Sequence, residues 1–104
     1  MTIHARKRWT LPSGRSVWLG NDGRRQDSVL VNTDRGCGSV YAGSPCPADR
    51  EHMHYNSIVF CNDSAIAVFE TEQEADALVD QIAEHVAAGR RFIEISAGRI
   101  TKSL

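Results

Sequence analysis

Residues 71–89 limit the fold more than any other part of this chain, because they carry a complete set of helix signals. Thr71-Glu72-Gln73-Glu74 is a capping box, in which the Thr71 hydroxyl accepts from an amide of the first turn and Glu74 reaches back to the cap residue. Gly89 suits a C-terminal cap. The apolar residues between these ends recur at three- and four-residue spacing: Ala75, Leu78, Val79, Ile82 and Val86. The sequence therefore predicts an amphipathic helix whose stripe packs on a sheet.

A hairpin is predicted near the start of the chain. Residues 8–11 and 15–19 alternate apolar and polar positions around Pro12-Ser13-Gly14, a three-residue loop with Gly in the left-handed position. Pairing across this loop puts Trp9 opposite Val17 and Arg8 opposite Trp18. We therefore expect one face, with Trp9 and Leu11, to join the core, and Arg8 and Trp18 to lie together on the outer face.

Further strands are predicted on both sides of a long irregular stretch. Residues 28–32 read as a third strand, and residues 55–61 and 65–70 as a hairpin that turns at Asn62-Asp63. Both runs of that hairpin are apolar on both faces, which is typical of central strands covered above and below. Residues 92–96 read as a last strand, and a right-handed crossover would place it parallel to residues 65–70.

The predicted fold class is α+β: a mainly antiparallel sheet of five to six strands, hairpins first, packed against one C-terminal amphipathic helix that a short strand follows. A chain of 104 residues fits a single domain over 1–104. Residues 33–54 are expected to form a long irregular loop, with 39–42 as a short edge strand, and residues 98–104 a frayed tail. Loops of that length in small domains are usually functional or disordered.

Apolar runs in this sequence are far shorter than the roughly 20 residues that cross a bilayer, so no membrane partner is expected. The basic N-terminus has no apolar stretch behind it, and the three cysteines are an odd number. These features predict a cytoplasmic protein.

Four potential metal ligands fall within the irregular stretch: Cys37, Cys46, His52 and His54. Two thiolates and two imidazoles suit tetrahedral zinc, and a small zinc-stabilised module is therefore one alternative. The eight residues between the cysteines exceed the usual two to four of a metal knuckle, so the first expectation is that no cofactor is bound. Cys61, in an apolar strand, is expected to be a small buried side chain.

Charge is divided unevenly between the two halves of the chain. Residues 1–52 hold eight Lys and Arg against five Asp and Glu, and residues 53–104 hold four against eight. Cations interleaved with Trp9 and Trp18 make nucleic-acid binding one weakly supported alternative. The acidic helix residues are a second, as the imitation of a nucleic-acid backbone by an inhibitor, although carboxylates in the first turn also suit the helix dipole.

No Walker loop, dinucleotide fingerprint or nucleophile elbow occurs in this chain, so the sequence leans against an enzyme. The favoured interpretation is a small intracellular interaction or regulatory protein of bacterial or phage type. It would bind a larger macromolecule, most simply a protein, through residues 33–54 and the outer face of the first hairpin. The residues expected at that surface are Arg8, Trp18, Arg24, Arg25 and Tyr41. A homodimer through an open sheet edge is a further expectation.

Overall fold

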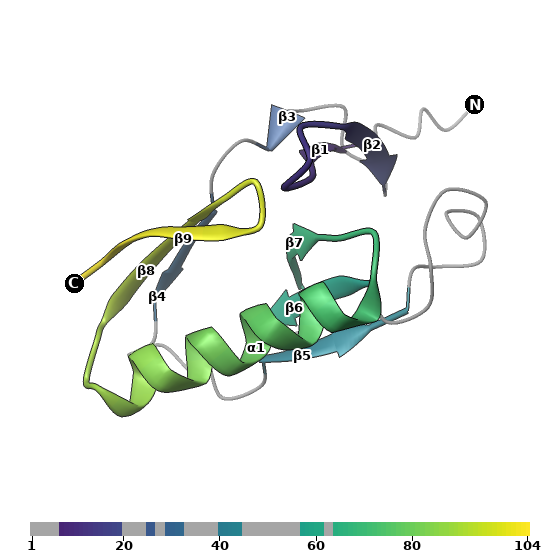
Figure 1. Cartoon of the computed structure of the whole chain (residues 1–104). Helices are drawn as coiled ribbons and strands as arrows, with labels where there is room; N and C mark the ends of the chain where they lie inside the picture. The colour runs from purple at the N-terminus through teal and green to yellow at the C-terminus, as the bar shows by residue number, and fades with distance from the viewer. Residues whose placement is uncertain (1–6, 20–24, 27–28, 33–39, 45–56, 62–63) are drawn as a thin grey trace.

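The computed structural model describes residues 7–19, 25–26, 29–32, 40–44, 57–61 and 64–104 (Figure 1). These residues form nine strands and one helix. In chain order they are β1 (Lys7–Thr10), β2 (Ser16–Leu19), β3 (Arg25–Gln26), β4 (Val29–Asn32), β5 (Val40–Gly43), β6 (Ile58–Cys61), β7 (Ser64–Val68), α1 (Glu72–Ala87), β8 (Phe92–Ser96) and β9 (Arg99–Ser103).

The strands form three sheets of three strands each, in the orders β2-β1-β3, β4-β8-β9 and β5-β6-β7. Every described pairing is antiparallel except that of β1 with β3, which is parallel. The α+β class with a mainly antiparallel arrangement and a helix late in the chain is therefore confirmed. The strands are shorter and more numerous than the five to six that the sequence predicts.

The first hairpin has the register that its alternation predicts. Trp9 pairs with Val17 and Arg8 with Trp18. Gly14 has a φ of 91°, and the loop is closed by bonds from the Leu11 amide to the Arg15 carbonyl at 2.8 Å and from the Gly14 amide to the Leu11 carbonyl at 2.9 Å. Trp9 and Leu11 are buried, so this side of the hairpin joins the core as expected.

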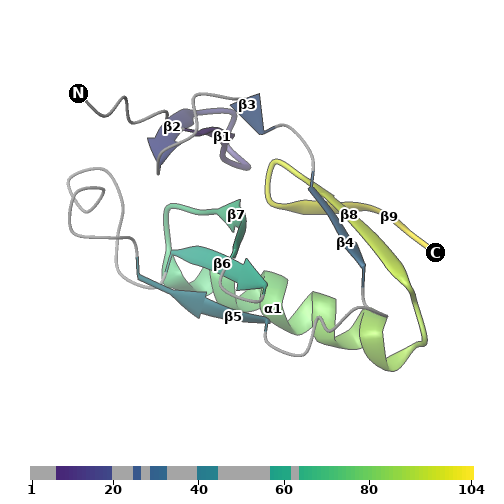
Figure 2. The same cartoon turned by 180° about the vertical axis from the view of Figure 1, so that it is seen from behind.

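The sheet β5-β6-β7 is covered on both faces, as the doubly apolar sequence of β6 and β7 predicts. On one face Val59, Ala67 and Phe69 pack with α1 in the larger cluster of buried residues. On the other, Ile58 and Val68 pack with Trp9 and Leu11 from the first hairpin. Figures 1 and 2, which view the molecule from opposite sides, show α1 in front of this sheet and then behind it. A register shift between Val59 and Phe60 lets one strand serve both clusters.

Helix α1 begins and ends as the sequence predicts. The Thr71 hydroxyl accepts from the Glu74 amide at 3.2 Å and donates to the Glu74 carboxylate at 3.0 Å. At the other end the Gly89 amide donates to the Val86 carbonyl and the Arg90 amide to the His85 carbonyl, which is a Schellman motif with Gly89 at φ 81°. The helix therefore has hydrogen-bonded caps at both ends.

The chain after the helix differs from the expectation in two respects. β8 is not parallel to β7; it pairs antiparallel with β4 on one side and with β9 on the other. The crossover rule applies only to two strands of the same sheet, and these two lie in different sheets. Residues 99–103, expected to fray, form β9, and the amides and carbonyls of Phe92 and Leu104 bond to each other beyond its end.

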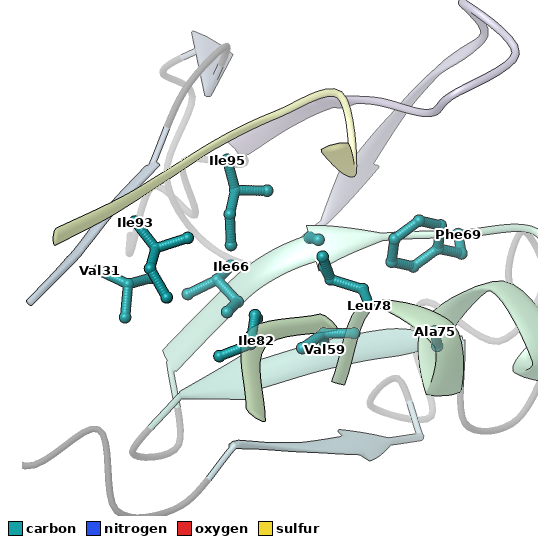
Figure 3. Close-up of a cluster of buried hydrophobic side chains, with 10 residues drawn as sticks. Val31, Val59, Ile66, Phe69, Ala75, Leu78, Ile82, Ile93 and Ile95 are labelled. Carbon is teal, nitrogen blue, oxygen red and sulfur yellow. The ribbon is translucent and has the colours of Figure 1, made fainter. Parts of the chain in front are cut away.

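The core between α1 and the sheets is continuous (Figure 3). Leu78 and Ile82 are 2% and 1% exposed, and they meet Ile66 of β7 and Ile93 and Ile95 of β8 in one cluster. Val86, the last residue of the predicted stripe, is instead 42% exposed. The expectation that the whole stripe is covered is therefore wrong at its C-terminal end, where a hollow between β5 and α1 leaves Val86 open to solvent.

Candidate functional site

Strand pairing brings three of the predicted surface residues into one row. Arg8 is paired with Trp18 on its β2 side and with Arg25 on its β3 side. The neighbouring row, Val17, Trp9 and Gln26, contains the buried Trp9. Because successive positions of a strand alternate between the two faces, the positions of Trp18, Arg8 and Arg25 lie on the face of this sheet opposite to that of Trp9. We call these three residues the arginine row; Arg24 lies outside the described residues.

The arginine row places two like charges at directly paired positions. Arg8 and Arg25 are Cα partners in the parallel pair of β1 and β3. Like charges directly opposite each other on neighbouring strands are unfavourable, typically by some tenths of a kcal/mol to about 1 kcal/mol. An anionic group between them would relieve that repulsion, so the row is suited chemically to carboxylate or phosphate oxygens.

Tyr41, the fifth predicted surface residue, lies on β5, which forms where the sequence predicts a short edge strand at residues 39–42. Its ring is 38% exposed and stacks on Phe60 with centroids 5.4 Å apart and an interplanar angle of 22°. The Phe60 ring also covers Gly43, where a Cβ would lie 2.7 Å from the ring. Phe60 in turn packs against the cluster of Trp9, Leu11, Ile58 and Val68. Tyr41 therefore lies on the face of the central sheet that the first hairpin covers.

A hollow between β5 and α1, in the described part of the chain, is a surface feature that sequence reasoning missed. It has a volume of about 320 Å³, and its lining is aliphatic: Val40, Val79, Ile82, Ala83, Val86 and Ala87. Val40 comes from the outer strand of the central sheet, and the other five come from the second half of α1. The signal in the sequence is a pair of alanines, Ala83 and Ala87, on a flank where larger residues would have closed the space.

The acidic residues of the helix do not act as one continuous surface. Glu74 is engaged in the N-terminal cap, and Glu70, just before the helix, lies 3.4 Å from the guanidinium of Arg15. Glu72, Asp76, Asp80 and Glu84 are exposed. Glu74 and Glu70, both members of the acidic set behind the inhibitor hypothesis, therefore have local partners, and the hypothesis itself stays a prediction.

The zinc alternative rests on residues outside the described part of the chain. Cys37, Cys46, His52 and His54 all fall there, so the zinc site stays a prediction. Within the described ranges, no group of three or more His, Cys, Asp and Glu side chains is placed to hold a metal ion. Cys61 is half-buried and packs against the larger core cluster.

An imidazole and a hydroxyl meet at the far end of the molecule. His85 Nδ1 lies 3.0 Å from Ser103 Oγ, and the contact joins the last turn of α1 to β9. A Ser–His pair at this distance is one element of nucleophilic catalysis, which also needs a group that orients the base and donors for an oxyanion. Neither is present among the described contacts, and we interpret the His85–Ser103 contact as a structural link between α1 and β9.

Comparisons with known proteins give no relative for this chain: no family model, no curated protein and no solved structure matches it. Among the described residues, no helix is long and apolar enough to cross a membrane. The function is therefore argued from the surfaces above.

Proposed function

We propose that this chain is a non-enzymatic protein of the cytoplasm that binds a larger protein partner, and that the arginine row is the centre of the contact. The observation that carries the proposal is the register that aligns Trp18, Arg8 and Arg25 across three strands. Tyr41, exposed on the face of the central sheet that the same hairpin covers, belongs to the proposed surface.

The residue types in the row support a binding role. Trp, Tyr and Arg are the side chains most enriched at the points that dominate protein–protein affinity. A guanidinium binds a carboxylate through two parallel hydrogen bonds, and two adjacent guanidiniums favour a partner with clustered Asp and Glu. We therefore expect an acidic surface on the partner.

A protein partner is favoured over nucleic acid by the charge of the chain as a whole. The net charge is −1, and five exposed carboxylates lie along α1. A phosphate backbone is attracted by an extended basic surface, and a duplex or long strand would also meet the field of these carboxylates. An isolated cationic row suits a local acidic patch better.

Affinity capture from native cells tests the proposal with matched arginine variants. Full-length protein with Arg8→Gln and Arg25→Gln is compared with wild type and with Arg99→Gln, which removes an exposed arginine from β9 in another sheet. We expect one protein to be captured by wild type and by the Arg99 variant, and its recovery to fall about tenfold, or about 1.4 kcal/mol, with the double variant. If the double variant captures as much of this protein as wild type does, the proposal is contradicted. If nuclease treatment abolishes the capture, the surface binds nucleic acid instead.

The stability of the same variants separates a binding role from a structural one. Because Arg8 and Arg25 are paired like charges, replacing Arg25 by Gln should leave the free energy of unfolding unchanged or raise it by up to about 1 kcal/mol. Denaturant unfolding measures this. A clear loss of stability would mean that the arginines stabilise the fold. The loss of binding would then not show that they contact a partner.

A further inference from the structure

The hollow between β5 and α1 has the size of a side-chain pocket. Sites for drug-sized ligands and cofactors span about 300 to 1,000 Å³, and at about 320 Å³ this one is at the lower limit. A space of this volume has room for one or two aliphatic side chains. Val86, 42% exposed at its rim, is one of five large apolar residues that the described surface leaves open to solvent.

The flank of α1 beside the hollow is acidic. Asp76 precedes Val79 by three residues, and Asp80 precedes Ala83 by three, so these carboxylates alternate along the helix surface with the residues that line the hollow. Both aspartates are exposed. They lie four and eight residues into the helix, beyond the first turn in which the dipole favours acids.

Asp76 and Asp80 are also four residues apart, a spacing at which like charges destabilise a helix. Neither the dipole nor the cap therefore stabilises these two carboxylates. A cation above them would offset their mutual repulsion. The hollow is also accessible from the side, because β5 is the outer strand of its sheet among the described strands. A chain can enter there without displacing a strand.

We propose that this hollow is a second docking site, separate from the arginine row, for a segment of a partner protein in which an aliphatic side chain lies next to Lys or Arg. The aliphatic side chain fills the space beside Val79, Ala83 and Val86. The cation lies over Asp76 and Asp80. The apolar contact supplies most of the affinity and the charges supply specificity, because exposed ion pairs contribute little on their own.

The test is a selection from a phage-displayed library of random dodecapeptides on immobilised full-length protein, followed by affinity measurements with the enriched peptides. We expect enriched sequences to carry Leu, Ile or Val within two positions of Lys or Arg. Ala83→Leu fills the hollow with a good helix former and should weaken these peptides at least about tenfold. Its control is Gln81→Leu, which adds the same side chain at an exposed helix position outside the lining and should leave affinity unchanged.

The charge arm replaces Asp76 and Asp80 together by Asn, with Glu72→Gln as the control for an exposed carboxylate in the first turn of the same helix, away from the lining. The double variant should bind a few-fold more weakly at low salt, and the difference should shrink as salt is added, because exposed charges are screened. Peptides that bind the Ala83→Leu variant as tightly as wild type would overturn the proposal, and so would a selection with no enrichment. Concentration-dependent dimerisation that Ala83→Leu abolishes would assign the hollow to a second copy of this chain instead.

Discussion

Two hairpins of this protein turn on a glycine with positive φ, and they are held in opposite ways. The loop of the β1-β2 hairpin contains Gly14 at φ 91°, where an added Cβ would meet nothing within 4 Å. The β8-β9 hairpin turns on Ala97 at φ 49° and Gly98 at φ 73°. At Gly98 an added Cβ would lie 2.6 Å from the Phe69 ring and 3.1 Å from Pro12. The requirement for glycine therefore rests on backbone geometry alone at Gly14, and on geometry and packing together at Gly98.

This difference distinguishes the first hairpin, which carries the proposed binding surface, from the second, whose tip packs on the core. The tip of the β8-β9 hairpin is wedged against Phe69, which is 3% exposed and belongs to the cluster under α1. At the tip of the β1-β2 hairpin Ser13 and Gly14 are exposed, whereas Pro12 lies against Gly98 and the first strand is anchored by Trp9 and Leu11. Substitutions near the first tip can therefore change the surface at small cost, whereas those at the second alter the packing of the core.

Gly98→Ala should give the largest effect of the substitutions that test this contrast. The new methyl meets a buried ring that has little room to move, which costs about 1 to 3 kcal/mol, and the left-handed backbone adds about 1 to 2 kcal/mol. We expect a total loss of about 2 to 5 kcal/mol in the free energy of unfolding. Urea denaturation with a fixed m-value measures it.

A double-mutant cycle with Phe69→Leu shows whether the ring is the cause. If the clash with Phe69 dominates, the two substitutions together should cost less than the sum of their separate effects by about 1 kcal/mol or more. Strict additivity would contradict the packing explanation and leave only the backbone effect.

Gly14→Ala should be milder because only the backbone opposes it. The left-handed conformation costs a non-glycine residue about 1 to 2 kcal/mol, and no neighbouring atom adds to this. The melting temperature of a domain of this size should fall by roughly 4 to 8 °C for each kcal/mol. A loss as large as that of Gly98→Ala would remove the distinction between the two tips.

The first hairpin could be predicted from the sequence in full, and the second could not. Pro12-Ser13-Gly14 with alternation on both sides is a local signal, and local signals also predict the caps at Thr71 and Gly89. The β8-β9 turn has Ala97 where Asn or Asp is usual, so no turn signal marks it. Its tip is held by Phe69, nearly thirty residues away, and that contact is not visible in a single sequence.

The arginine row and the hollow also differ in how far the sequence predicts them. The pairing of Arg8 with Trp18 follows from the length of one loop, but its pairing with Arg25 requires a parallel contact across an intervening stretch. The hollow could not be predicted, because it exists only where β5 passes the second half of α1. Ala83 and Ala87 indicate it only once the structure is known, and Val86, exposed at its rim, reads from the sequence alone as one more buried residue of the stripe.

Ala97→Asn tests the β8-β9 turn with a substitution that should stabilise it. With Ala97 and Gly98 both at positive φ, the connection is a two-residue type I′ turn, in which Asn-Gly is the favoured pair. Asn tolerates the left-handed region better than Ala does, so the variant should be more stable by about 0.5 to 1 kcal/mol. Ala97→Val, a β-branched residue in the same position, should lower stability, and equal stability of the two variants would argue against the turn assignment.

The ion pair beside the first tip should have the smallest effect. Arg15 Nε lies 3.4 Å from Glu70 Oε1, but the two side chains are 58% and 41% exposed, so solvent and salt screen the attraction. Arg15→Ala should cost at most about 0.5 kcal/mol, and the difference should vanish in 1 M salt. Exchanging the two residues, Arg15→Glu with Glu70→Arg, should restore wild-type stability if the pair matters. A loss above about 1 kcal/mol would mean that the first tip is held to the connection between β7 and α1 more firmly than its exposed geometry allows, and the contrast between the two hairpins would weaken accordingly.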